Sequence, residues 1–138
     1  MQILSALTAL FILAVPVLTV RVSYDNTYDN GANSLNIVAC SDGSNGLESK
    51  GYTTFESLRN FPNIGGTFEV RGWNSPNCGT CWQLGYKGRT INMVAIDHTD
   101  DGFNLSEDAM NQLTNGQAAK LGVVDATFQQ VSMSHCML

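Results

Sequence analysis

The residues of this sequence that could do chemistry gather in one stretch, 97–106, which reads DHTDDGFNLS. It sets Asp97, Asp100 and Asp101 close to His98. Glycoside hydrolysis usually needs two carboxyl groups across the sugar bond, so the stretch could supply half of a sugar-cleaving site. Asp97 ends the apolar run INMVAI, and a carboxylate at a strand end often lines a groove. The equally common alternative is that Asp97 caps a turn through its own backbone amides.

Other catalytic templates are missing from the sequence. There is no Gly-x-Ser-x-Gly nucleophile elbow and no His-Glu-x-x-His zinc motif. Of the two histidines, His98 could orient Asp97 or fill a turn, and His135 is expected on the surface at a strand end. The glycine-rich run CSDGSNG lacks the lysine and the following Ser or Thr of a nucleotide-binding loop. The sequence therefore predicts no cofactor.

The four cysteines favour structural disulfides over a metal or redox site. An even count in a short exported chain implies a disulfide framework, although spacing alone leaves the pairing open. A redox Cys-x-x-Cys usually stands where a strand meets a helix, whereas the pair at 78 and 81 precedes the strand-like run WQLGY. A zinc site needs two close pairs of ligands, but Cys40 and Cys136 are isolated, so no metal is predicted.

The chain is expected to consist of a signal peptide, residues 1–19, and one domain, residues 20–138. The apolar core Leu4–Leu13 carries no charge, and small residues precede the cut that we expect just ahead of Val20. A membrane anchor is the alternative, because an uncharged run of about 18 residues approaches the length of a spanning helix. Pro16 and the rapid return to polar sequence favour cleavage. The sequence therefore predicts a secreted, extracellular protein.

The charge balance excludes two classes of partner. With 12 acidic and 7 basic residues, the net charge is -5, so the chain is a poor partner for a phosphate backbone and no nucleic acid is expected. No run of lysine and arginine occurs, which argues against a polybasic membrane patch.

Periodicity and turn residues predict about six strands with two or three short helices. Alternating runs indicate strands over 20–24, 67–73, 81–87, 90–97 and 123–133. Helices are expected over 55–61 behind a capping pair of Thr53 and Glu56, from Ser106 to Asn115-Gly116, and over 116–122. Ala109, Met110 and Leu113 are predicted to form the buried side of the second helix. The expected class is mainly β, a small barrel with helices at its mouth.

The segment AIDHTDDGFNLSEDAM resembles part of the expansins and related endoglucanases, which are double-psi β-barrels. In that group an Asp at the strand end is followed by His-Phe-Asp-Leu-Ser, and the acid of that run is replaced here by Asn104. An amide cannot donate a proton as a general acid at ordinary pH. The resemblance therefore implies a site without its proton donor.

The whole of 20–138 resembles the cerato-platanin family of small secreted fungal proteins, through six segments in order: VSYDNTYDN, VACSDGSNGL, FPNIGG, WNSPNCGTCWQL, IDHTDDGFNLS and LTNGQAAKLG. This implies a six-stranded double-psi β-barrel with disulfides Cys40–Cys78 and Cys81–Cys136. It also implies no known hydrolytic activity, binding of chitin oligosaccharides and elicitation of plant defence responses. Some members loosen cellulose without cutting it, and some self-assemble at interfaces.

The resemblance places a carbohydrate groove on the face that carries the end of the Asp97 strand. The candidate contacts are Tyr24, Asp25, Asp97 and Asn104, because sugars favour planar amides, carboxylates and aromatic faces. The alternatives are core packing for Tyr24 and an Asx turn for Asp25. Trp73 is a further aromatic candidate, whereas Trp82 is expected to pack against the disulfide at the preceding cysteine. Asn104 also begins a glycosylation sequon, expected to be unused because its serine caps a helix.

Three classes of function follow from these patterns. The favoured one is a secreted, non-catalytic protein that binds chitin oligomers or cell-wall polysaccharide and acts as an elicitor at the plant cell surface. The second is a surface-active protein that self-associates through exposed apolar patches. The third is a weak endoglucanase that would use Asp97 and another carboxylate, against which Asn104 argues.

Overall fold

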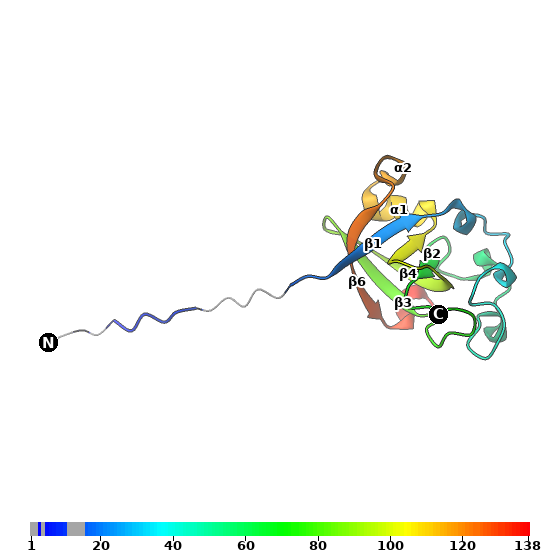
Figure 1. Cartoon of the computed structure of the whole chain (residues 1–138), viewed down its shortest axis with the longest axis horizontal. Coiled ribbons are helices and arrows are strands. Elements are labelled where there is room, and N and C mark those ends of the chain that lie inside the picture. Colours follow the sequence, from blue (N-terminus) through cyan, green and yellow to red (C-terminus); the bar gives the residue numbers. More distant parts are fainter. Residues whose placement is uncertain (1–2, 4, 11–15) are drawn as a thin grey trace.

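The computed structural model of the chain describes residue 3, residues 5–10 and residues 16–138 (Figure 1). The predicted signal peptide falls partly outside the described residues, and its cleavage ahead of Val20 stays a prediction. Thr19 already pairs with Thr127, so this cut would remove only the first residue of the barrel. Among the described residues, no helix is long and apolar enough to cross a membrane.

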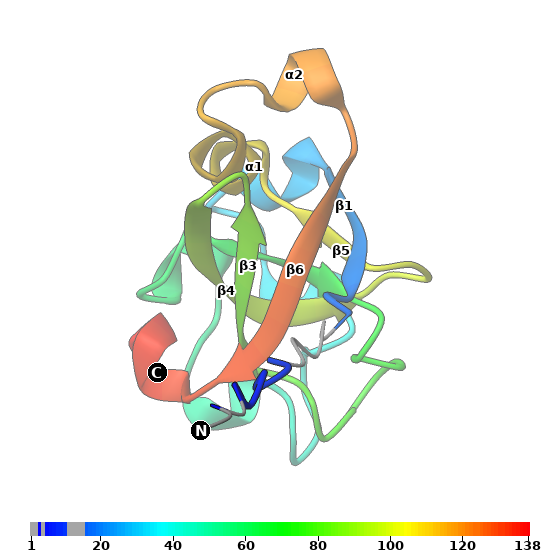
Figure 2. The same ribbon diagram turned by 90° about the vertical axis from the view of Figure 1, so that its left-hand side faces the viewer.

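Within the described residues, six strands close into one barrel (Figure 2). They are β1 (Thr19–Tyr24), β2 (Ile64–Thr67), β3 (Cys81–Tyr86), β4 (Arg89–His98), β5 (Phe103–Leu105) and β6 (Val124–Val131). Their order around the barrel is β1-β5-β2-β4-β3-β6. The pairs β1–β5 and β2–β4 are parallel and the other pairs are antiparallel. The prediction of a mainly β, six-stranded double-psi barrel is confirmed.

The helices are short and lie outside the barrel. The α-helices in the described part of the chain are α1 (Glu107–Thr114) and α2 (Ala118–Leu121). The 3-10 turns are η1 (Asn26–Asp29), η2 (Leu35–Ile37), η3 (Glu48–Lys50), η4 (Phe55–Ser57) and η5 (Met133–Cys136). Both α-helices lie near one end of the barrel, as predicted for a barrel with helices at its mouth (Figures 1 and 2).

Helix α1 begins and ends where the sequence predicts. The Ser106 hydroxyl accepts the backbone N–H of Ala109 at 3.0 Å, which satisfies one of the free donors of the first turn. Asn115 ends the helix in the left-handed conformation with a φ of 55°. Ala109, Met110 and Leu113 are fully buried, so the predicted apolar side of the helix is confirmed.

A cluster of aromatic rings fills part of the core. The ring centroids of Trp82 and Phe103 lie 5.7 Å apart, and Phe68 and Phe128 lie 5.9 Å apart. Trp82 is buried and packs in this cluster, with its indole N–H donating to the Thr80 hydroxyl at 2.8 Å.

The strand predicted over 67–73 is wrong. Strand β2 ends at Thr67, and the chain then turns, with the backbone N–H of Val70 donating to the Thr67 carbonyl at 3.2 Å. The alternating pattern of residues 67–73 arises because Phe68 packs in the aromatic cluster and Val70 is fully buried, although both residues follow the strand and lie in this turn. The actual strand contains the glycine pair Gly65-Gly66.

Gly65 and Gly66 let β2 pass between two close neighbours. A Cβ on Gly65 would stand 2.2 Å from the carbonyl oxygen of Asn104 in β5. A Cβ on Gly66 would stand 3.2 Å from the carbonyl oxygen of His98 in β4. The missing side chains therefore permit the close contacts on which closure of the barrel depends.

The first predicted helix is reduced to the single 3-10 turn Phe55–Ser57. The capping pair predicted from Thr53 and Glu56 does not form. Instead, the Ser57 hydroxyl accepts the backbone N–H of Thr53 at 3.1 Å and that of Thr54 at 3.2 Å. The serine hydroxyl thus binds N–H groups ahead of the turn, as the reciprocal half of a capping box whose N-cap is Thr54.

Strand β5 lies where the sequence suggests only a loop before a helix. It is three residues long, too short to show periodicity. It is held by neighbours on both sides, since Asn104 pairs with Ser23 in β1 and with Gly66 in β2.

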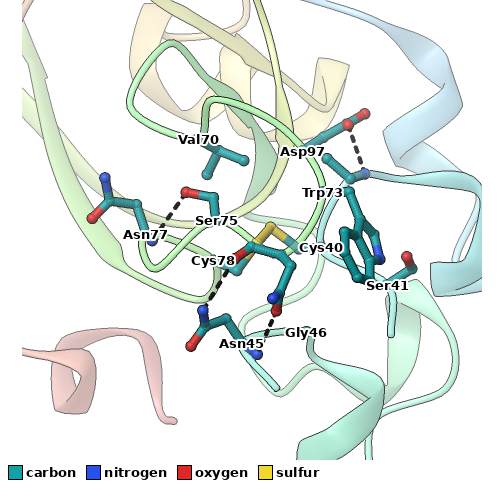
Figure 3. The surroundings of a disulfide bond; sticks show 12 residues. Cys40, Ser41, Asn45, Gly46, Val70, Trp73, Ser75, Asn77, Cys78 and Asp97 are labelled. Atoms are coloured by element: carbon teal, nitrogen blue, oxygen red, sulfur yellow. Dashed lines mark hydrogen bonds between the residues drawn. A yellow bond between two sulfur atoms is a disulfide. The ribbon is translucent and has the colours of Figure 1, made fainter. Parts of the chain in front are cut away.

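Two disulfides fasten the loops to the barrel. Cys40 is joined to Cys78 and Cys81 to Cys136, which is the pairing that the resemblance implies. The first bond connects the loop after η2 with the loop before β3 (Figure 3). Since no cysteine is free, the redox and zinc alternatives for the Cys-x-x-Cys segment do not apply.

The role of Gly65 can be measured against Gly72, at which an added Cβ meets nothing within 4 Å. We expect Gly65→Ala to lower the free energy of unfolding by about 2 kcal/mol or more, because the new methyl group overlaps the β5 backbone. Gly72→Ala is the matched control and should change stability by less than about 1 kcal/mol. Urea denaturation followed by far-UV circular dichroism would measure both variants. Equal stabilities would contradict the account of β2.

Candidate functional site

The predicted residues Asp97 and Asn104 lie in one row that crosses four strands. Gly66 in β2 pairs with Asp97 in β4 on one side and with Asn104 in β5 on the other. Asn104 pairs in turn with Ser23 in β1. Residues paired across a sheet project from the same face, so Asp97, Asn104 and Ser23 share a face, with the bare glycine between the first two. With strands roughly 4.8 Å apart, the Cα atoms of Asp97 and Asn104 are separated by about 10 Å.

A bulge in β4 gives Asp97 this orientation. Gly65 pairs with Ala95, but Gly66 pairs with Asp97, so Ile96 is an extra residue in β4. Such a bulge shifts the alternation of side chains along a strand. As a result, Ala95 and Ile96 are both buried, while Asp97 is half-buried on the outer face.

The Asp97 carboxylate joins three parts of the chain. One oxygen accepts the backbone N–H of Ala39 at 3.0 Å and that of His98 at 2.9 Å. The other accepts the Tyr28 hydroxyl at 2.8 Å. Both interpretations of Asp97 therefore hold in part: it binds its neighbouring amide as a turn cap, and it also stands at a strand end on the polar face.

Tyr28 is a site residue that the sequence analysis missed. Its side chain is buried, and its hydroxyl lies 3.4 Å from the position that a Cβ on Gly66 would take. Burial raises the pKa of the Tyr28 hydroxyl, and the neighbouring charge of Asp97 raises it further. Tyr28 therefore stays protonated and donates to Asp97 throughout the physiological pH range.

Asn104 has a free donor toward the outer face. Its Oδ1 accepts the Ser23 hydroxyl at 3.0 Å. Among the described residues, no acceptor lies within hydrogen-bonding distance of its Nδ2. A half-buried carboxamide with one end fixed and an unused N–H group can donate to a ligand hydroxyl.

The other two candidates, Tyr24 and Asp25, lie differently. Tyr24 pairs with the buried Leu105 and packs against the core, so it lies on the opposite face of β1 from Ser23. Asp25 continues the extended backbone, with a φ of -142°, and is exposed. Its carboxylate accepts the backbone N–H of Thr27 at 2.8 Å, which is the predicted Asx turn. The polar face thus includes Asp25 at its edge and leaves Tyr24 out.

Asp29 fixes the position of η1, and hence of Tyr28. Its two carboxylate oxygens accept the backbone N–H groups of Glu107 and Asp108 at 2.8 and 3.0 Å. A carboxylate at this end of α1 also complements the helix dipole. The sequence offered no signal for this contact, because it joins residues about eighty positions apart. In contrast, the glycine pair was a signal for a close approach that could have revealed Gly66.

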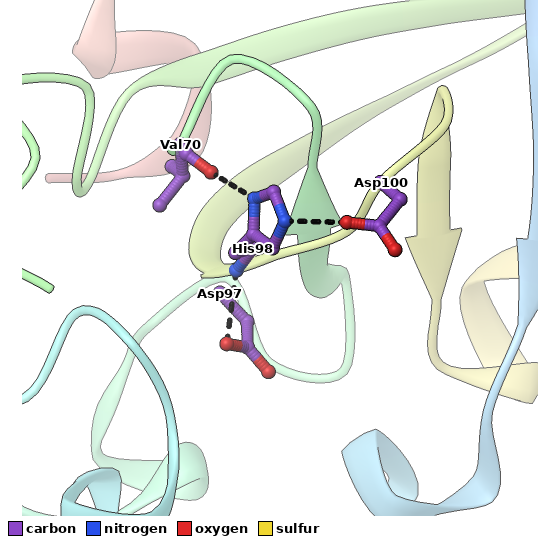
Figure 4. Close-up of polar contacts among 4 residues, drawn as sticks. All are labelled: Val70, Asp97, His98 and Asp100. Carbon is purple, nitrogen blue, oxygen red and sulfur yellow. Dashed lines mark hydrogen bonds and ion pairs between the residues drawn. The ribbon is translucent and has the colours of Figure 1, made fainter. Parts of the chain in front are cut away.

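His98 links two loops next to the row. Its Nδ1 lies 2.6 Å from the Val70 carbonyl oxygen, and its Nε2 lies 2.9 Å from a carboxylate oxygen of Asp100 (Figure 4). Both ring nitrogens face acceptors, which suits the imidazolium form with an N–H on each. The bond to Val70, and then that to Asp100, raise the pKa of the His98 imidazole. The His98 imidazole therefore acts as a loop clamp, and His98 binds the Asp97 side chain only through its backbone N–H.

The glycosylation sequon lies within this framework. Asn104 is the central residue of β5, between β1 and β2. The hydroxyl of Ser106 accepts from Ala109 and donates to the carbonyl of Pro62 at 2.5 Å. Ser106 is fully buried and occupied by the helix cap, in agreement with the reason for expecting an unused sequon.

The larger hollows lie away from the row. A cavity of about 350 Å³ is lined by residues of the β3–β4 turn and of the α1–α2 connection, among them Arg89 and Leu121. Asp97, Asn104 and Ser23 do not line this cavity. Among the described residues, no group of three or more His, Cys, Asp and Glu could hold a metal ion.

Comparison with known proteins connects this architecture to one family. The family model described as cerato-platanin matches residues 20–138. A heat-stable 19 kDa antigen of Coccidioides immitis is 46% identical over 120 residues, which cover 87% of this chain and 82% of the antigen. The crystal structure of cerato-platanin 3 from M. perniciosa has a TM-score of 0.85 at 45% identity and covers 88% of this chain and 100% of its own. The solution structure of the fungal elicitor cerato-platanin has a TM-score of 0.75 at 38% identity, over 85% of this chain and 96% of its own.

The clamp at His98 predicts a pH-dependent contribution to stability. Because its pKa is raised in the folded protein, the contribution is complete below the unfolded value of 6.5 and is lost as pH rises through the folded value. The melting temperature of His98→Gln should therefore fall further below that of the wild type at about pH 5 than at about pH 9. His135→Gln, a change of the other histidine, is the control. If the difference in melting temperature between the wild type and His98→Gln instead increases with rising pH, the stabilising role of the charged His98 is wrong.

Proposed function

The chain belongs to the cerato-platanin family, and we propose that it is a secreted, non-catalytic fungal protein that binds chitin oligosaccharides or cell-wall polysaccharide and elicits plant defence responses. The observation that carries this proposal is the row formed by Asp97, Gly66, Asn104 and Ser23. It presents fixed polar groups on an outer face beside a residue without a side chain.

The chemistry of the row suits a sugar. Sugar hydroxyls both donate and accept, and the row offers carboxylate acceptors at Asp97 and a free amide donor at Asn104. These groups are held by Tyr28, Ala39 and Ser23, so little rotational freedom is lost when a ligand binds. Gly66 itself is buried beneath the Tyr28 hydroxyl and the His98 carbonyl, so the groups of the row that a sugar would contact are those of Asp97 and Asn104.

The same row supports binding without cleavage. Glycoside hydrolysis needs an acid that protonates the departing oxygen and a second carboxylate. Asn104 stands where the related endoglucanases have their acid, and a carboxamide has no proton to give at ordinary pH. Asp97 already accepts hydrogen bonds from Tyr28, Ala39 and His98, which fits a structural and binding role.

The proposed elicitor role comes from the family. The relatives compared above are fungal proteins, and one solved relative is described as a fungal elicitor. This chain covers 96% of that relative at 38% identity with a TM-score of 0.75, so the two have the same barrel fold. We extend the role to this protein, with the plant cell surface as its site of action.

A surface-active, self-associating protein is the alternative function. From residue 20 onward, exposed large apolar side chains occur at Ile37, Trp73, Leu121, Val123, Met133 and Met137. They belong to separate elements, namely η2, the loop before β3, the α2–β6 junction, and η5 with the residue that follows it. Dynamic surface tension and film formation would measure such activity, and strong activity without sugar binding would favour this alternative.

Binding at the row can be tested by NMR titration of residues 20–138 with chitohexaose. We expect shifts of the amide signals of Asp97, Gly66 and Asn104, including the side-chain amide of Asn104. Asn104→Ala should weaken binding about fivefold, which corresponds to one hydrogen bond of about 1 kcal/mol.

Gln129→Ala is the matched control for this titration. Gln129 is also a carboxamide that bonds across a strand pair, donating to Gln83 at 2.8 Å, but it lies on the β3–β6 face. Its loss should leave chitohexaose affinity unchanged. If the wild-type amides do not move at millimolar sugar, chitin oligomer binding is ruled out.

The absence of catalysis can be tested with the same oligosaccharide. After prolonged incubation, we expect the wild type to release no new reducing ends from chitohexaose or cellulose, because Asn104 supplies no proton. A reducing-end assay and mass spectrometry of the sugar would measure this. Release by the wild type that disappears in Asp97→Asn would establish an enzyme and overturn the proposal.

A further inference from the structure

Trp73 is an exposed aromatic side chain on a loop that is tied down on several sides. It is 63% exposed, whereas Trp82, the other tryptophan, is 6% exposed and lies in the core. An indole group has a large apolar surface, so leaving it in water costs stability that burial would recover. An exposed tryptophan is therefore informative when the structure also fixes its orientation.

Hydrogen bonds hold the Trp73 ring by one edge. Its Nε1 donates to a carboxylate oxygen of Asp42 at 2.6 Å. The adjacent ring atom Cζ2 lies 3.1 Å from the place that a Cβ on Gly43 would take, so this edge stands directly against the loop backbone. Gly43 has a φ of 83°, a conformation that favours glycine. Both contacts use one edge of the ring, which is consistent with an aromatic face open to solvent.

The two loops on either side of this contact are also fastened together. Asn74, next to the tryptophan, accepts the backbone N–H of Asn45 at 2.9 Å through its side chain. The side chain of Asn45 donates back to the Asn74 carbonyl at 3.0 Å. The Cys40–Cys78 disulfide closes the same loops covalently (Figure 3). Trp73 thus has a fixed position relative to the barrel.

A short segment connects this position with the polar row. The backbone N–H of Ala39 donates to Asp97, and three residues later Asp42 binds the indole of Trp73. Three extended residues span at most about 10 Å, so the indole lies within a few sugar units of Asp97. Figure 3 shows Asp97 and Trp73 on the same side of the disulfide region, with Cys40 and Ser41 beside them.

We propose that Trp73 is a stacking subsite for a pyranose ring of the same β-linked GlcNAc chain whose neighbouring units contact Asp97 and Asn104. The apolar C–H face of a pyranose can lie against the open indole face, while the polar row binds hydroxyl and acetamide groups. This inference rests on the proposed function and extends it, because it makes affinity depend on chain length. Asp42 is the positioning residue that sets the angle of the indole.

The test compares chitobiose with chitohexaose in the wild type and in Trp73→Ala. We expect the loss of the indole to weaken chitohexaose binding about tenfold and to leave chitobiose binding at the polar row unchanged. Trp73→Phe should keep most of the affinity because it retains an aromatic face. Leu121→Ala removes another exposed apolar side chain, near α2 at the far end of the barrel, and should change nothing.

The role of Asp42 has its own readout. Asp42→Ala frees the indole N–H and should lower chitohexaose affinity and move the Trp73 side-chain N–H signal, whereas Asp42→Asn keeps an acceptor oxygen and should restore both. In the wild type, chitohexaose should shift that signal and quench the fluorescence of Trp73 but not that of the buried Trp82. Identical behaviour of Asp42→Ala and Asp42→Asn would overturn the positioning role.

The failure of this inference can be told from that of the proposed function. If chitohexaose shifts the amides of Asp97 and Asn104 while Trp73→Ala binds like the wild type, the stacking subsite is wrong and the row stands. If chitohexaose changes only the Trp73 signals, the stacking subsite is supported and the proposal of sugar binding at the polar row is wrong. If neither responds, both are overturned. A further outcome is that the wild type does not respond to sugar but associates with itself, and that Trp73→Ala abolishes this association. Trp73 would then bind a second copy of the chain and not a sugar, which would overturn the subsite.

Discussion

The absence of side chains at Gly65 and Gly66 is the constraint on which the rest of the structure depends. Strand β2 lies between β4 and β5, and a Cβ on Gly65 would stand 2.2 Å from the backbone of β5. Without this close approach β5 would lose one partner, and a three-residue strand has few hydrogen bonds of its own. The barrel would then lack the connection between β2 and β1. Closure and the polar outer row thus have the same origin, because Gly66 is also the member of the row that lies between Asp97 and Asn104.

Around this constraint, polar groups are organised by contacts between distant parts of the chain. Asp97, at the end of β4, accepts hydrogen bonds from Tyr28 in η1 and from the backbone of Ala39. Asp29 accepts hydrogen bonds from the first residues of α1 and so connects η1 to that helix. The carboxylates nearest the row are therefore used for structure, in contrast to a hydrolase, which keeps two of them free for the reacting bond. The result is a polar surface whose groups are held in place by hydrogen bonds from several parts of the chain.

The sequence predicted well what depends on local signals. The cap at Ser106, the left-handed end of α1 at Asn115 and the two long strands β3 and β4 follow from residues within a few positions of each other. Strand β2 and strand β5 could not be predicted in this way, since each is three or four residues long and is defined by its neighbours. Of the site, the row position of Asp97 and Asn104 and the turn at Asp25 were accessible from the sequence and the family resemblance. Tyr28 and Asp29 were not, because their partners are far away in the chain and no spacing rule reports a tertiary hydrogen bond.

The fastening of the two loops around Trp73 has a consequence for proteolysis. Exposed loop tips are preferred sites of proteolysis, and their cleavage depends on local unfolding of the segment. Here the Cys40–Cys78 bond and the reciprocal Asn45–Asn74 contacts would all have to yield together before either loop could detach. The surface that displays the aromatic ring of Trp73 is in this way also expected to resist proteolysis.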